Sequence, residues 1–287
     1  MAEICLPFAL AQPSLLHGIL ALSSRHMMTL QPENRWYHLA YHHHSQQFFS
    51  LFPNDLQKPP SLEMTNLAHS NIFLANVLSS AEPMVHSWVT VQDPQEIDQA
   101  FSWIKLQARH QWILRPYAPW LSDCYLQPIF KRAPRSLQLH PATACGITEP
   151  LPIESLRDLI AHGSSRRHLL TRGLDLLIES YDPDPALPYL NVFDRSLGFI
   201  CSMEEEFLHL LHQKDEVALV LFTYWLCHMV GLNLWWFSKA SDECRAICCF
   251  LKNSVDLRVQ ALVDYPLRVC DLMVDFRGTL SQESSQG

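Results

Sequence analysis

The segment 216–237, EVALVLFTYWLCHMVGLNLWWF, constrains the fold of this chain more than any other part of the sequence. Within residues 217–232 its only polar side chains are Thr223, Tyr224 and His228. Apolar residues therefore occupy every face of a 3.6-residue period, a pattern typical of a helix buried on all sides. The run is shorter and more interrupted than the roughly 18 to 20 apolar residues that a membrane span needs, so we expect no membrane span. A helix of this kind requires a shell of other helices around it.

Proline and capping signals divide the rest of the chain into such helices. Pro13 can begin a first helix, Pro53 is expected to end a second, and Asp93-Pro94 has the form of an N-cap followed by the first helical residue. No strand-like alternation recurs. We expect helices over residues 13–30, 33–52, 62–82, 95–114, 152–162, 166–181, 216–237, 241–264 and 267–276.

The expected fold class is therefore all-α, with a single large multi-helix domain over residues 1–287 around the buried central helix. A length of 287 residues also allows two closely joined helical domains. Residues 115–152 are rich in proline, and we interpret them as a loop or lid that contains a short helix near 121–130. Residues 281–287 are expected to form a frayed tail.

The net charge of −8 argues against direct nucleic-acid binding, since affinity for nucleic acid comes largely from Lys and Arg on phosphates. The nine cysteines have no framework spacing and often lie in apolar stretches, which favours reduced, buried thiols. The N-terminus has no basic region followed by an apolar core, so no secretory signal is expected. These features predict an intracellular protein, cytoplasmic or nuclear.

Motifs for metal and cofactor chemistry are weak. The neighbouring His42, His43 and His44 lie about 100° apart on a helix, from which we infer that the three cannot converge on one ion. His38 and His42 have the usable i, i+4 spacing, but His-Glu-x-x-His is absent. Two prolines break up Asp182-Pro-Asp-Pro, so it cannot present carboxylates from a continuous helix. No nucleotide-binding or hydrolase motif occurs, and we predict no metal site and no cofactor.

The central helix carries the most informative candidates for a binding site. Tyr224 and His228 lie at i, i+4 and are expected to face the same way. They can be a satisfied pair in the core, or polar groups on the aromatic wall of a small-molecule cavity. The predicted ligand-binding residues are Phe222, Trp225, Leu226, Met229, Trp235, Trp236 and His17, with His26 as a weaker candidate.

Three blocks of sequence, in a fixed order, resemble the regulatory domain of fungal-specific zinc-cluster transcription factors of the sterol-uptake control type. The first block is LPFALAQPSLLHGILALSSRHM at 6–27, with Tyr37, Ala40 and Tyr41 following before Phe48 and Phe49. The second is ALVLFTYWL at 218–226. The third comprises the aromatic residues 235–237 and the closing Tyr-Pro at 265–266.

The resemblance implies an all-α, often dimeric module in which an apolar pocket senses a lipid such as a sterol. The zinc cluster of this family requires Cys-x2-Cys pairs, and none occurs here. We therefore expect an effector half without its DNA-reading half, which acts as a homodimer or through a transcription-factor partner.

Two functions remain open from the sequence. In the first, the chain binds an apolar small molecule (a sterol, a terpenoid or a polyketide-like compound) in a helical pocket and acts as a regulator. In the second, the same pocket is a cofactor-free enzyme that folds a polyene or terpenoid for intramolecular cyclisation in secondary metabolism. Tyr224 and His228 would then stabilise developing charge on the substrate. The sequence does not decide between them.

Overall fold

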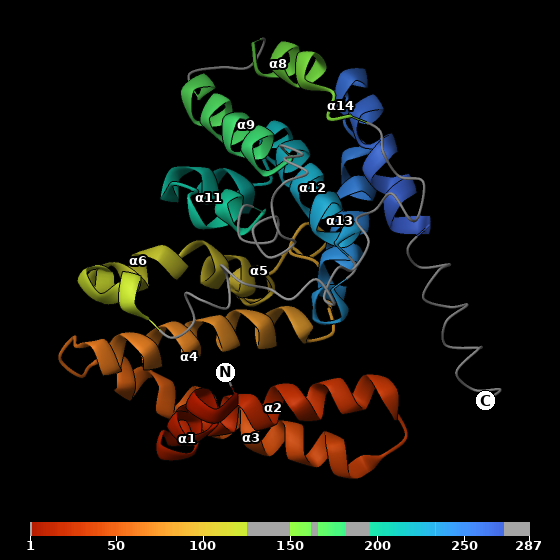
Figure 1. Cartoon of the computed structure of the whole chain (residues 1–287). Coiled ribbons are helices and arrows are strands. Elements are labelled where there is room, and N and C mark those ends of the chain that lie inside the picture. The colour runs from red at the N-terminus through yellow and green to blue at the C-terminus, as the bar shows by residue number, and fades with distance from the viewer. Residues whose placement is uncertain (1, 125–149, 162–165, 182–195, 233, 273–287) are drawn as a thin grey trace. The chain divides into compact units, whose positions relative to one another are not determined.

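The computed structural model describes residues 2–124, 150–161, 166–181, 196–232 and 234–272 (Figure 1). Within these ranges the chain forms helices and no strands, which confirms the predicted all-α class. Contacts within the chain group it into two compact units, residues 1–82 with 109–133 and residues 83–108 with 134–287. We call them the N-terminal and the C-terminal unit. The single domain over 1–287 stays a prediction.

The N-terminal unit is built on an antiparallel pair of long helices, α2 and α3, which lie side by side in Figure 1. Asn34 caps α3 by accepting a hydrogen bond from the amide of Trp36, and Ser61 caps α4 through the amide of Met64. The helices of the unit are α1 (Ala2–Ala11), α2 (Pro13–Leu30), α3 (Arg35–Leu56), α4 (Leu62–Ala81), α6 (His110–Leu114) and the 3₁₀ helix η1 (Arg115–Asp123).

Gly18 lets α2 approach its neighbours closely. A Cβ atom at this position would lie 2.8 Å from Leu74 Cδ1 on α4 and 2.9 Å from Phe48 Cδ2 on α3. Real Cβ contacts are longer than this, so a larger residue at this position would force the side chain of Leu74 or Phe48 to shift. The short distance between α2 and α3 brings polar side chains of the two helices into contact.

In the C-terminal unit the other helices pack around α12, which lies between α9 and α13 (Figure 1). Asp215 caps α12 by accepting a hydrogen bond from the amide of Ala218. The unit contains α5 (Pro94–Ala108), α8 (Ile153–Ala161), α9 (Arg167–Tyr181), α11 (Glu205–His212), α12 (Glu216–Gly231), the 3₁₀ helix η4 (Trp235–Phe237), α13 (Ser238–Leu251) and α14 (Leu257–Leu262), with further helical turns at 196–201 and 264–272.

The central helix is buried on all sides, as its sequence predicted. Every residue from Ala218 to Cys227 is buried, and the side chains of Phe222 and Trp225 have no exposed surface. The helix is shorter than expected, because it ends at Gly231 and the aromatic residues 235–237 form a separate 3₁₀ turn. Glycine weakens a helix, and the amide of Leu232 already bonds back to the carbonyl of Met229.

Three other helix boundaries differ from the prediction. The helix expected over 95–114 is interrupted at Arg109, where the chain passes from the C-terminal to the N-terminal unit. The helix expected over 241–264 is divided at 252–256, where Asp256 caps α14. Residues 2–11, for which the sequence predicted no helix, form α1.

Pro53 was also expected to end α3, and this was wrong. The helix continues to Leu56 because the fixed φ of proline is compatible with a helix, although the ring removes one backbone hydrogen bond and crowds the preceding turn. Contacts outside α3 hold the extra turn: Asp55 is 8% exposed and accepts hydrogen bonds from Ser14 Oγ and Asn71 Nδ2.

The Pro-rich segment 115–152 is described only in part. Residues 115–123 form η1 rather than a loop, and residues 125–149 lie outside the described ranges. Asp182-Pro-Asp-Pro and the tail 281–287 also lie outside them.

Candidate functional site

The predicted pair Tyr224 and His228 lies on α12, and the Tyr224 hydroxyl and His228 Nε2 both form hydrogen bonds with the surrounding structure. Tyr224 donates its hydroxyl hydrogen to the carbonyl of Leu262, at 2.8 Å. The carbonyl of Tyr224 itself accepts a hydrogen bond from the hydroxyl of Tyr181, at 2.7 Å. The Tyr224 hydroxyl therefore ties α12 to α14, an arrangement suited to holding the core together.

His228 is bonded to Ser196, a residue that sequence analysis did not single out. His228 Nε2 lies 2.8 Å from Ser196 Oγ, and the ring of Tyr181 packs on the imidazole with centroids 4.4 Å apart. Burial lowers the pKa of His228 to about 4, so the imidazole is neutral at pH 7. The Ser196 carbonyl accepts a hydrogen bond from Trp225 Nε1 at 2.6 Å. Ser196 and His228 are far apart in sequence, and no motif signals their contact.

The predicted ligand-binding residues on α12 are core residues. Phe222, Trp225, Leu226 and Met229 have no exposed surface. The ring of Trp225 stacks on Phe222 and on Phe199, at centroid distances of 5.3 and 5.7 Å. Trp235, 36% exposed, and the half-buried Trp236 lie on η4, after the helix has ended.

His17 and His26, the remaining predicted residues, lie on α2 of the N-terminal unit. His17 Nδ1 is 2.8 Å from His44 Nδ1 on α3. Ligand atoms of His17, His43 and His44 all lie within 4.8 Å of one another. The inference that neighbouring histidines on α3 cannot converge was therefore incomplete, because it left out a third imidazole supplied by α2. The pair His38 and His42 is different, since His38 Nε2 contacts the carbonyl of Pro32 at 2.8 Å.

A groove of about 610 Å³ lies on the C-terminal unit, among α5, α9 and α11. This volume is within the range of about 300–1,000 Å³ that small-molecule sites occupy. Its apolar lining comes from Phe101, Leu169, Leu208 and Leu210, and its polar lining comes from Lys105, Arg166, Glu205, Glu206, His209 and His212. None of the residues predicted from the sequence lines it.

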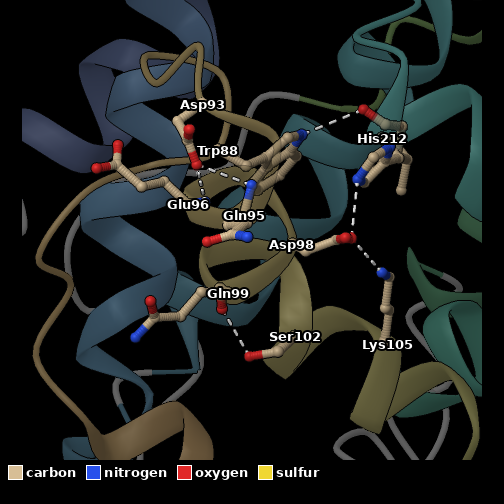
Figure 2. A network of polar contacts seen from close by, with 10 residues as sticks. Trp88, Asp93, Gln95, Glu96, Asp98, Gln99, Ser102, Lys105 and His212 are labelled. Atoms are coloured by element: carbon tan, nitrogen blue, oxygen red, sulfur yellow. Dashed lines mark hydrogen bonds and ion pairs between the residues drawn. The ribbon is translucent and has the colours of Figure 1, made fainter.

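An ionic network fixes one side of this groove (Figure 2). Lys105 Nζ and His212 Nε2 lie 2.7 and 3.2 Å from the same Asp98 carboxylate oxygen. Lys105 and His212 lower the pKa of Asp98, with Lys105 as the larger cause. Trp88 Nε1 donates a hydrogen bond to the Leu211 carbonyl at 3.1 Å, which anchors the end of α11.

Glu243 is a buried carboxyl group that the sequence did not reveal. It is 1% exposed on α13, and Ser87 donates its hydroxyl hydrogen to Oε1. Oε2 has no hydrogen-bond partner among the described residues. Burial raises the pKa of Glu243 to about 8, so the carboxyl group is mostly protonated at pH 7.

Comparison with known proteins gives one match. The model of the fungal specific transcription factor domain matches residues 1–112, whereas residues 113–287 lie outside this match. No curated protein and no solved structure matches the chain. In the parts of the chain that the structure covers, no helix has the length and apolar content needed to cross a membrane. The resemblance noted in the sequence is thus confirmed over residues 1–112, which match the fungal specific transcription factor domain.

Proposed function

We propose that this protein is a regulatory module that binds an apolar small molecule in the groove among α5, α9 and α11. The match of residues 1–112 to a transcription factor domain suggests the regulatory role. The groove supports the ligand part of the proposal, because its volume of about 610 Å³ suits a single metabolite. The groove is the observation that carries the proposal.

The chemistry of the lining favours a mostly apolar, uncharged ligand. Side chains of Leu169, Leu208 and Leu210 offer an apolar wall. The two cations at the groove already have acidic partners, since Lys105 pairs with Asp98 and Arg166 with Asp215. An anionic ligand would compete with these carboxylates, whereas a neutral hydroxyl or carbonyl group can bond to the rim without breaking an ion pair. A sterol, a terpenoid or a polyketide-like compound has this composition.

The groove is a better place for the ligand than the surroundings of α12. The tyrosine and histidine of α12 have their hydrogen bonds to Leu262 and Ser196, and the rings beside them pack on one another. A ligand there would have to displace well-packed side chains, at the cost of lost contacts. In the groove it displaces water, which favours binding.

Regulation follows if the ligand binds one arrangement of α5, α9 and α11 more tightly than another. Occupancy then shifts the population towards that arrangement and alters a partner surface. We propose that the partner is a transcription factor or a second copy of the chain, in the nucleus or the cytoplasm. Direct binding to nucleic acid is not part of the proposal, because the chain carries a net charge of −8 and no Cys-x2-Cys pair.

No observation among the described residues favours the second function, a cofactor-free cyclisation enzyme. Its proposed groups, Tyr224 and His228, are occupied by bonds within the core.

The proposal is tested by the unfolding temperature of the purified chain in the presence of ergosterol, farnesol and aromatic polyketides. We expect at least one compound to raise the unfolding midpoint in a concentration-dependent manner. His209→Trp, an exposed position in the groove lining, should fill the groove and abolish the shift. Asp175→Trp is the matched control, since Asp175 is exposed on α9 outside that lining.

Two results would contradict the proposal: no compound shifts the midpoint, or the shift is the same in His209→Trp. The same incubations, analysed by mass spectrometry, would reveal any turnover and so reopen the enzyme.

A further inference from the structure

Three histidines from two helices meet on the N-terminal unit. His17 projects from α2, and His43 and His44 project from α3. The ring centroid of His17 lies 6.0 Å from that of His43 and 5.0 Å from that of His44, and the centroids of His43 and His44 are 5.0 Å apart. The ligand atoms of the three rings lie within 4.8 Å of one another.

The sequence brings these rings together through the packing of α2 on α3. Gly18, next to His17, leaves room for Phe48 of α3, which lies one helical turn beyond His44. With the helices this close, His17 reaches the space between the two neighbouring histidines of α3. Neighbouring side chains on one helix point about 100° apart and do not meet over their own helix. Both can still reach a side chain that projects from the facing helix.

We propose that His17, His43 and His44 bind a first-row transition-metal ion of the zinc type. Zn²⁺ is held by imidazole nitrogens at about 2.0–2.1 Å, and tetrahedral ligands are then about 3.3 Å apart. His17 Nδ1 and His44 Nδ1 are 2.8 Å apart, and the ligand atoms of all three rings lie within 4.8 Å of one another. The tetrahedral spacing of about 3.3 Å lies between these two distances. Side-chain rotations that change the distances between the ring nitrogens by about 0.5 to 1.5 Å would complete the tetrahedral geometry. The fourth position is left to water.

The direct contact between the rings of His17 and His44 also suits a metal. The contact of 2.8 Å between the Nδ1 atoms of His17 and His44 is a hydrogen bond in which one nitrogen offers a lone pair. A divalent cation among the three rings would be stabilised by their nitrogen lone pairs.

The positions also suit entry of an ion. His43 is exposed, and His17 and His44 are half-buried, so an ion reaches the cluster directly from solvent. The bound ion would connect α2 to α3 and so stabilise the N-terminal unit. This inference does not depend on the small-molecule groove, which lies in the C-terminal unit.

The test is a zinc titration of the full chain after treatment with EDTA, in competition with a chromogenic chelator. We expect one ion per chain at micromolar or lower free zinc, together with a rise in the unfolding midpoint. His17→Ala and His44→Ala should each weaken binding by more than the roughly 10–100-fold that loss of an outer-shell group costs. His42→Ala is the matched control, since His42 is exposed on the same helix outside the cluster and should leave affinity unchanged.

A second measurement distinguishes this site from ions held by thiols. Co²⁺ bound to three imidazoles and water should show strong visible absorption without the near-ultraviolet band that thiolate ligands produce. Circular dichroism of each variant shows that the helices are intact. Zinc binding that persists in His17→Ala, or a thiolate band in the cobalt spectrum, would overturn the proposal. So would failure of the folded chain to bind any ion.

Discussion

The two compact units bury their polar groups in different ways. In the N-terminal unit, polar side chains bond to each other between helices: Ser14 and Asn71 donate to Asp55, and Asn76 Nδ2 contacts His110 Nδ1 at 2.7 Å. In the C-terminal unit, the polar atoms of aromatic residues mostly bond to backbone carbonyls. The examples are Trp88 to Leu211, Tyr224 to Leu262 and Trp225 to Ser196.

This difference separates two ways of fixing a helical core. Matched polar side chains specify one arrangement, and the loss of one member leaves a buried partner without a hydrogen bond. Aromatic rings contribute mainly through buried area, and their loss leaves a cavity. The two units should therefore respond to different substitutions.

The largest effect is expected from Trp225→Ala in the C-terminal unit. The side chain has no exposed surface, and its Nε1 satisfies the carbonyl of Ser196. Its removal should lower the free energy of unfolding by about 3–5 kcal/mol, because it leaves a large cavity and an unpaired carbonyl. Urea unfolding followed by circular dichroism measures the change.

The control for this prediction is Trp36→Ala in the N-terminal unit. Trp36 is 77% exposed, so its substitution should change stability by less than about 0.5 kcal/mol. Equal losses in the free energy of unfolding for Trp225→Ala and Trp36→Ala would contradict the prediction, since Trp36 would then be covered by something that packs on it.

Asp55→Ala is the corresponding change in the N-terminal unit. Asp55 accepts hydrogen bonds from Ser14 and Asn71 and forms an ion pair with Lys58 at 2.8 Å. Without the carboxylate the Ser14 hydroxyl loses its acceptor, and Asn71 Nδ2 keeps only Ser14 Oγ, at 2.9 Å. We therefore expect a loss of about 2–3 kcal/mol in the free energy of unfolding, measured by urea titration.

Asp55→Asn retains one carbonyl acceptor and should recover part of this stability. Asp123→Ala, an exposed position in the same unit, should have almost no effect. If Asp55→Ala proves as neutral as Asp123→Ala, then the polar contacts do not hold the end of α3.

These contacts also mark the limit of what the sequence could predict. The helical class, α2 at 13–30, the cap at Asp93 and the burial of α12 follow from local signals and apolar periodicity. The turn after Pro53 did not follow, because it depends on Ser14 and Asn71 from other helices. Local sequence does not encode which distant side chain will lie opposite a given residue.

The candidate sites are harder for the same reason. The sequence prediction placed the ligand at α12, from Tyr224 and His228 at i, i+4 among aromatic residues, and this stays a prediction. The groove that carries our proposal combines α5, α9 and α11, which no local pattern brings together. Likewise, a run of histidines on one helix gave no sign that His17 would meet His43 and His44. The available signal was Gly18 beside His17 on one predicted helix, together with His43 and His44 on the next.

The third prediction concerns Glu243, where we expect a smaller change in stability than at Trp225 or Asp55. The Glu243 side chain accepts a hydrogen bond from the Ser87 hydroxyl in the C-terminal unit. The other carboxyl oxygen has no hydrogen-bond partner in the part of the chain that the structure describes. We therefore expect the Glu243 carboxyl group to lower the free energy of unfolding at neutral pH, whereas Asp55 raises it.

The change of the free energy of unfolding with pH follows from the raised pKa of Glu243. The pKa of Glu243 rises from about 4.5 to about 8 in the folded state. Below pH 4.5 the carboxyl group is protonated in both states and costs nothing. As the pH rises from 4.5 to 8, only the unfolded chain releases its proton, so the free energy of unfolding falls; above pH 8 both states are ionised and the cost is constant.

Glu243→Gln keeps the shape of the side chain and removes the titration. At pH 7 the pKa difference sets an upper limit of about 3 kcal/mol on the gain in the free energy of unfolding. We expect about 1–2 kcal/mol, because the buried amide of Gln keeps part of the desolvation cost. The variant and the parent chain should converge towards pH 4.5. Urea titrations at pH 5, 6, 7 and 8 measure the difference, with the exposed Glu96→Gln on α5 as the control. A constant difference across this range would mean that Glu243 is ionised in the folded state, and the C-terminal unit would then hold a buried charge as the N-terminal unit does at Asp55.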